Sequence, residues 1–150
     1  MTLLTLTLAL VALLFALAAT VVRRVPDGQV YSLYRGGSIR LLQPGVHVVL
    51  PGLERLGHRI DLGGRVLRLA PAPASTLQAT VYWQVLEPER ADAVIDRAEQ
   101  LIGSRALALL GEQSAAPESP RALSGQLKLA LNAALREHGV MVTRVELASA

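Results

Sequence analysis

The first 22 residues of this 150-residue chain contain no charged side chain, and this run constrains the fold more than any other feature. Residues 3–22 consist only of Leu, Ala, Val, Thr and one Phe. As a helix rising about 1.5 Å per residue, such a run spans roughly 30 Å, the thickness of the hydrocarbon core of a bilayer. The residues that follow suffice for one water-soluble domain with its own hydrophobic core.

Two interpretations of this run are open, an uncleaved membrane anchor and a cleaved signal peptide. A signal peptide usually has a basic start and an apolar stretch of about 7–15 residues before a small-x-small cleavage site. Met1-Thr2 carries no basic residue, which favours the anchor, whereas Ala16-Leu17-Ala18 fits a cleavage site. Arg23 and Arg24 follow directly, and basic flanks stay on the cytoplasmic side. The sequence thus predicts a single-pass protein, of the bacterial inner membrane for instance, with its N-terminus outside and its C-terminal part cytoplasmic.

The composition argues against several classes of function. Without cysteine there are no disulfides, no thiolate catalysis and no zinc-finger chemistry. Five aromatic residues give too few stacking platforms for a nucleic-acid binder of the single-strand type. His47, His58 and His138 lack metal-ligand spacing, and Ser104 and Ser124 lie outside the G-x-S-x-G nucleophile motif. We therefore expect no enzyme activity, no cofactor, no metal site and no nucleic-acid partner.

Basic charge is concentrated just after the apolar run. Between Arg23 and Arg68, eight arginines accompany three acidic residues, whereas from Leu69 onward seven basic residues accompany nine acidic ones. Such charge can lie on a solvated sheet face, or it can contact anionic lipid, where each basic side chain near the surface gains about 1 kcal/mol.

Short apolar runs bounded by Gly or Pro predict strands after the anchor. Pro26-Asp27-Gly28 forms a turn before the first of them, and Gly36-Gly37 and Gly63-Gly64 are typical of hairpins. Strands predicted at residues 29–34, 39–42, 46–50, 59–62, 65–69 and 77–86 form an antiparallel meander sheet. A final strand is predicted at residues 140–147. In strand 77–86 the odd-numbered residues, from Leu77 to Val85, form the buried face. In the last strand Met141, Thr143, Val145 and Leu147 share one face, opposite Val142 and Arg144.

Between the last two strands the apolar period becomes that of helices. One helix is predicted from Pro88, broken or kinked at Gly103 and resuming over residues 106–110; its apolar stripe is Ala91, Val94, Ile95, Ala98 and Ile102. Residues 112–120 are predicted as a loop. A second helix is predicted over residues 123–138, with Gly139 at its C-cap; its apolar face is Leu123, Leu127, Leu131, Ala134 and Leu135. The fold class is α+β.

Several motifs follow one another in a fixed order: VPDGQV at residues 25–30, L-x-P-G-x-H-x-x-x-P at 42–51, RIDL at 59–62, TVYWQV at 80–85 and GVMVTRVE at 139–146. Together they resemble the SPFH or Band 7 domain of stomatins, prohibitins and flotillins. The resemblance covers residues 25–147 and implies an anchor with its basic flank at residues 1–24 and an SPFH-like domain at residues 25–148. The family-motif positions, with structural roles, are Pro26, Gly28, Pro44, Gly45, His47, Pro51, Asp61, Gly139, Arg144 and Glu146.

The resemblance implies a membrane-anchored scaffold that organises membrane patches or modulates membrane proteins such as proteases. Its partners would be the lipid bilayer, membrane proteins and a longer SPFH relative. Because relatives usually continue into a long heptad-bearing helix after the last strand, we expect at most weak homo-oligomers here. The alternative function is that of a secreted or periplasmic domain, released by signal cleavage, with ligand-binding or hydrolase activity.

Overall fold

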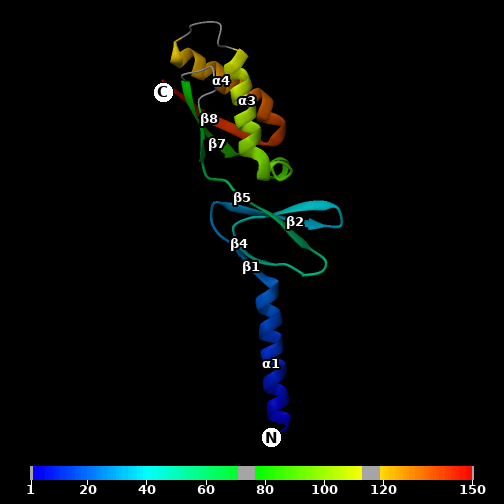
Figure 1. Ribbon diagram of the computed structural model, residues 1–150. Coiled ribbons are helices and arrows are strands. Elements are labelled where there is room, and N and C mark those ends of the chain that lie inside the picture. The colour runs from blue at the N-terminus through cyan, green and yellow to red at the C-terminus, as the bar shows by residue number, and fades with distance from the viewer. Residues whose placement is uncertain (1, 71–76, 113–118, 150) are drawn as a thin grey trace. The chain divides into compact units, whose positions relative to one another are not determined.

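A computed structural model describes residues 2–70, 77–112 and 119–149 (Figure 1). The backbone falls into two compact units, Met1–Arg59 and Ile60–Ala150, called unit 1 and unit 2 below. Helices and strands are mixed along the chain, which confirms the α+β class. The predicted domain limits, residues 25–148, stay a prediction.

Unit 1 begins with the apolar helix α1, Thr2–Val21 (Figure 1). Within it, Leu3–Val21 has a mean hydropathy of 2.5, and none of that stretch is buried by other parts of the structure. This helix is therefore long and apolar enough to cross a membrane, as predicted. A signal sequence near an N-terminus has the same length and composition.

The chain passes from α1 into a strand that the sequence does not predict, β1, Val22–Val25. It pairs antiparallel with β4, Gly45–Val48, and the register sets Val22 opposite Val48. The backbone N–H of Val49 donates to the carbonyl of Val21 at 2.8 Å. The last residue of α1 is thus hydrogen-bonded to the chain that leaves β4.

The rest of unit 1 is a second small sheet in the order β3-β2-β5. It consists of β2, Gln29–Arg35, β3, Ser38–Leu42, and β5, Arg55–Asp61, whose last two residues belong to unit 2. The predicted hairpin at Gly36-Gly37 is confirmed, because both glycines have positive φ angles and Arg35 pairs with Ser38. The core of unit 1 is small; its hydrophobic cluster consists of Val25, Tyr31, Leu33, Leu42 and Val49.

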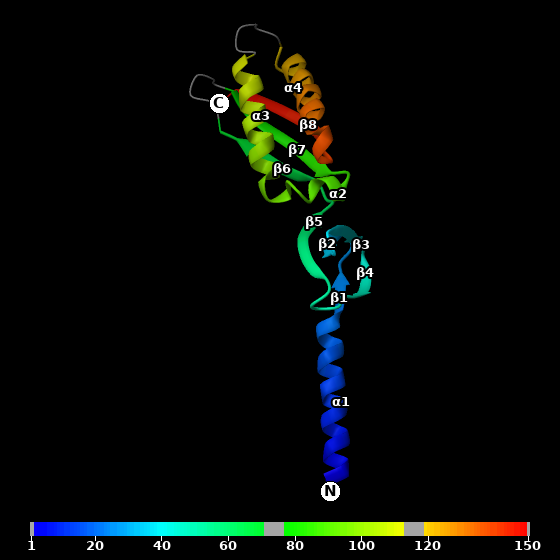
Figure 2. The same ribbon diagram turned by 90° about the vertical axis from the view of Figure 1, so that its right-hand side faces the viewer.

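Unit 2 contains a three-stranded antiparallel sheet in the order β6-β7-β8. Its strands are β6, Arg65–Leu69, β7, Leu77–Val85, and β8, Val140–Ser149. Two helices, α3, Ala98–Glu112, and α4, Pro120–Leu135, lie on one face of this sheet (Figure 2). In β7 the residues Ala79, Val81, Trp83 and Val85 are buried against them, as the alternation predicts.

The prediction of one continuous meander is wrong, because the strands form three separate sheets. The hairpin predicted at Gly63-Gly64 is also wrong. These glycines join β5 to β6, which belong to different sheets, and the Gly63 N–H donates to Asp61 Oδ1 at 2.9 Å. A glycine pair permits a sharp change of chain direction, but it does not determine whether the two strands that it joins pair with each other.

The helix predicted from Pro88 is divided into three pieces: α2, Pro88–Ala91, the 3-10 turn η1, Ile95–Arg97, and α3. The predicted break at Gly103 is wrong, since α3 runs through it to Glu112. Gly103 is buried, and a Cβ there would lie 3.3 Å from Leu69 Cδ2, so its small size permits close packing of α3 on the sheet. The predicted apolar stripe does face the core: Ala91, Val94, Ala98 and Ile102 are buried.

The second predicted helix is confirmed as α4 followed by the 3-10 turn η3, Arg136–His138. Ser119 caps its N-terminus by accepting from the Ala122 N–H, and Gly139 ends η3 in the left-handed conformation, with φ +65°. Leu127, Leu131 and Leu135 are buried as predicted. Ala134, predicted on the same face, is exposed. The predicted loop at residues 112–120 lies mostly outside the described residues.

Asn132, also on α4, bonds to the sheet through both ends of its amide. Its Nδ2 donates to the Val142 carbonyl at 3.0 Å, and its Oδ1 accepts from the Val142 N–H at 2.7 Å. A side chain therefore satisfies backbone groups of β8 that have no strand beside them, which ties the helix to the sheet edge.

Candidate functional site

The face of the β6-β7-β8 sheet opposite α3 and α4 carries no described helix of unit 2 (Figure 2). β7 presents Thr80, Tyr82 and Gln84 on this face, and the strand register sets residues of β6 and β8 beside them. These side chains are half-buried or exposed. They form the open sheet face: Val66, Arg68, Thr80, Tyr82, Gln84, Met141, Arg144 and Glu146. Tyr, Arg and Met are enriched where proteins bind one another, so this face has the composition of a contact surface.

Tyr82 lies at the centre of a polar cluster on the open sheet face. Its hydroxyl donates to Glu146 Oε2 at 3.1 Å, and the guanidinium carbon of Arg144 lies 5.9 Å from its ring centroid. Arg144 and Glu146 also form an ion pair. The Arg144 side chain is 70% exposed, so this pair adds little to stability. It does leave the guanidinium group open to solvent beside the half-buried ring of Tyr82.

A β-bulge determines which residues of β8 lie on this face. Arg144 pairs with Tyr82 but Val142 pairs with Trp83, so Thr143 is an extra residue. Its hydroxyl donates to the Tyr82 carbonyl at 3.1 Å. The predicted alternation of β8 is therefore wrong before the bulge. Val142 is fully buried on the core face together with Val145, whereas Met141 lies on the open sheet face with Arg144.

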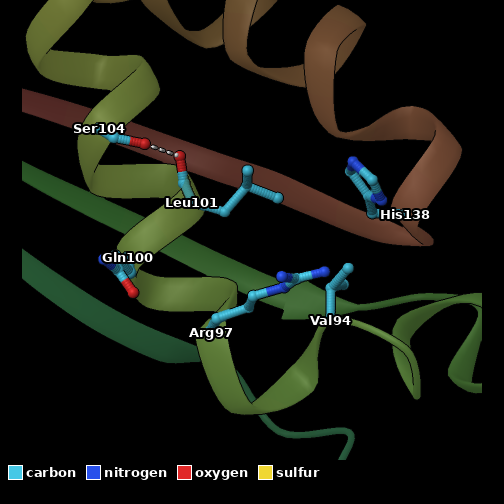
Figure 3. A pocket seen from close by; sticks show the side chains of 6 residues that line it. All are labelled: Val94, Arg97, Gln100, Leu101, Ser104 and His138. Carbon is cyan, nitrogen blue, oxygen red and sulfur yellow. Dashed lines mark hydrogen bonds between the residues drawn. The ribbon is translucent and has the colours of Figure 1, made fainter.

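A surface pocket of about 350 Å³ lies on the helical side of unit 2 (Figure 3). It is lined by Val94, Arg97, Gln100, Leu101, Ser104 and His138. The Ser104 hydroxyl donates to the Leu101 carbonyl of its own helix at 3.0 Å, and Figure 3 shows the Leu101 side chain between Ser104 and His138. The serine and the histidine are thus not arranged as a nucleophile and its base.

Six of the family-motif residues lie in unit 1, where they shape turns. Pro26 and Gly28 form the turn between β1 and β2, in which the Gln29 N–H donates to the Pro26 carbonyl at 3.3 Å. Pro44 and Gly45 connect β3 to β4, and His47 Nε2 lies 2.7 Å from the Gln43 carbonyl oxygen. Pro51 forms an isolated bridge with Glu54.

The other family-motif residues lie in unit 2. Asp61 and Gly139 shape turns, and only Arg144 and Glu146 come together in a polar cluster, the one around Tyr82. Tyr82 lies within the motif TVYWQV but is not among the ten family-motif positions given a structural role. The polar side of strand 77–86 could have identified it, but its partners in β8 depend on the bulge.

Arg23 and Arg24, predicted to flank the membrane, are exposed residues of β1 opposite His47 and Val46. Arg23 and Arg24 come two and three residues after the last residue of α1. Both belong to β1, so they lie in a strand directly after the apolar helix. Among the described residues, no three His, Asp or Glu side chains lie close enough to hold a metal ion.

A scan against protein-family models gives no match for this chain. A search of the curated proteins finds no similar sequence either.

Proposed function

We propose that this protein is a non-catalytic, single-pass membrane protein of the SPFH or Band 7 type that binds a protein partner through the open sheet face. In this proposal α1 is an uncleaved anchor, the N-terminus is outside, and the residues that follow α1 in unit 1, together with unit 2, are cytoplasmic. The partner is another membrane protein, such as a protease, or a longer SPFH relative.

The main support is the join between α1 and β1. The helix is continuous through Ala16-Leu17-Ala18, the sequence that fits a cleavage site, and its last carbonyl, that of Val21, accepts a hydrogen bond from Val49. Cleavage after Ala18 would leave only three residues before β1. The apolar helix α1 is not buried by other parts of the structure and continues directly into strand β1. A membrane anchor explains both features, because the bilayer would cover the helix. Arg23 and Arg24 favour the cytoplasmic side for the units that follow.

A first test measures the intact mass of the protein purified from membranes, together with the activity of a reporter fused to its C-terminus. We expect a mass that includes the whole of α1 and reporter activity on the cytoplasmic side. A soluble form that begins near Thr20 would contradict the proposal and favour the secreted alternative. Reporter activity on the outer side would contradict the orientation.

A second test places a photo-crosslinking amino acid at Arg144 on the open sheet face and, as the control, at the exposed Arg105 on α3. In intact membranes we expect a discrete protein adduct from position 144 and none from position 105. Tyr82→Ala should weaken the adduct about 10-fold or more, because truncation of a central interface residue costs roughly 2 kcal/mol. Equal adducts from both positions, or an adduct that persists in Tyr82→Ala, would contradict binding through this face.

A further inference from the structure

The β1–β4 ribbon of unit 1 exposes apolar side chains immediately beside the end of α1. Val22, Val46 and Val48 are 44%, 68% and 66% exposed. Because Val22 pairs with Val48 and Arg24 pairs with Val46, these four side chains share one face of the ribbon. Aliphatic side chains on a strand face next to a membrane-length helix would gain free energy by leaving water.

A tight turn after β4 adds two exposed leucines to this surface. Leu50 and Leu53 are 46% and 67% exposed, and the N–H groups of Leu53 and Glu54 both donate to the Leu50 carbonyl, at 3.2 and 3.1 Å. The turn begins one residue after Val49, which bonds to Val21 at the end of α1. We call Val22, Val46, Val48, Leu50 and Leu53 the apolar rim.

The charges around the apolar rim suit an anionic surface. Arg24 shares the rim's face of the ribbon and Arg55 follows the turn, and both are exposed; Arg23 is exposed on the opposite face of the ribbon. The carboxylate in the turn, Glu54, is directed inward: its side chain is only 5% exposed, it accepts from the Leu50 N–H at 3.1 Å, and it lies 3.7 Å from the Arg35 guanidinium. The rim is thus edged by positive charge, while its nearest carboxylate is withdrawn from the surface.

We propose that the apolar rim is inserted into the headgroup region of the membrane that α1 crosses, with the neighbouring arginines bound to anionic lipid headgroups. This inference rests on the proposed function, since it requires α1 to be an anchor. The occupant of the rim is the bilayer itself, because the hydrogen bond from Val49 to Val21 holds the rim at the point where α1 leaves the hydrocarbon core. Valine and leucine at that depth enter the boundary between headgroups and acyl chains, and arginine remains among the headgroups.

The chain contains no cysteine, so each introduced cysteine is a unique labelling position. The full-length protein is reconstituted into vesicles of phosphatidylcholine and phosphatidylglycerol, with an environment-sensitive fluorophore at one position at a time. The rim variants are Val48→Cys and Leu53→Cys. Leu10→Cys in α1 reports on the anchor, and Leu129→Cys, on the exposed side of α4, is the matched control at 72% exposure. Lipids carrying a quencher in the headgroup region or at the end of the acyl chain measure the depth of each label.

We expect the headgroup quencher to remove most of the fluorescence at Val48→Cys and Leu53→Cys, the acyl-chain quencher to act at Leu10→Cys, and neither to act at Leu129→Cys. Quenching at Leu10→Cys with rim labels that behave like Leu129→Cys would overturn the inference and leave the anchor intact. Rim labels shielded from aqueous iodide but not quenched by lipid would indicate a protein occupant and would also overturn it. Equal quenching at Leu129→Cys and at the rim positions would also overturn the inference. Absence of quenching at Leu10→Cys would overturn both the inference and the proposed anchor.

Discussion

Gly139→Ala is expected to lower the free energy of unfolding of unit 2 by about 3 kcal/mol or more. Overpacking alone costs about 1–3 kcal/mol, and a left-handed backbone adds about 1–2 kcal/mol for a residue with a Cβ. Gly139 has φ +65°, and a Cβ there would overlap the backbone carbonyl of Glu87. The Gly139 carbonyl also accepts from the N–H groups of Leu86 and Glu87, at 2.9 and 3.1 Å. The substitution therefore disturbs the contact between the end of α4 and the end of β7.

The measurement is urea unfolding followed by the fluorescence of Trp83, the single tryptophan, which is fully buried in unit 2. Gly125→Ala is the matched control. Gly125 lies inside α4 with open space around it, so alanine should raise stability by up to about 1 kcal/mol. A Gly139→Ala protein as stable as the unsubstituted one would show that this close contact does not exist.

Leu13→Arg is expected to reduce membrane insertion about 100-fold, because an arginine at the centre of a spanning helix costs roughly 2.5–3.5 kcal/mol on insertion scales. Leu13 lies near the middle of α1, and 58% of its surface is exposed. The measurement is the fraction of protein that stays with the membrane after alkaline carbonate extraction.

Thr20→Arg provides the control for the added charge. Thr20 lies at the end of α1, next to Arg23 and Arg24, where a long basic side chain reaches the headgroups at little cost. This variant should partition like the unsubstituted protein. If Leu13→Arg partitions in the same way as Thr20→Arg, α1 does not span the hydrocarbon core.

Local patterns predicted most strands of this protein and the positions of its helices. Alternation in β7, the glycine pair between β2 and β3, and the spacing of Leu127, Leu131 and Leu135 each reflect interactions within a few residues. Strand β1 was missed because its four residues, VRRV, carry no alternating pattern and directly continue the apolar run. It exists only because β4 pairs with it, some twenty residues further along the chain.

The candidate site was predictable only in part. The polar side of β7 predicted that Tyr82 lies away from the core, but the bulge at Thr143 is a tertiary feature. The bulge allows Val142 to pair with Trp83 on the buried face and Arg144 to reach Tyr82 on the other. Asn132, predicted only as part of a helix, proves to satisfy backbone groups at the sheet edge. The local sequence around Asn132 does not indicate which backbone N–H and C=O groups of the sheet lack a strand partner.

The membrane-length helix, the α+β class and the hairpin at Gly36-Gly37 follow from the amino-acid sequence, because hydrophobicity, side-chain period and φ angles act over short distances in the chain. The division of the strands among three sheets, and the face of β8 that carries Arg144, depend on the tertiary structure. The tertiary structure also sets the hydrogen bond from Val49 to Val21, which joins the end of α1 to the chain that leaves β4. These outcomes depend on hydrogen bonds between residues far apart in sequence. The residues of one strand do not by themselves indicate which distant strand pairs with it.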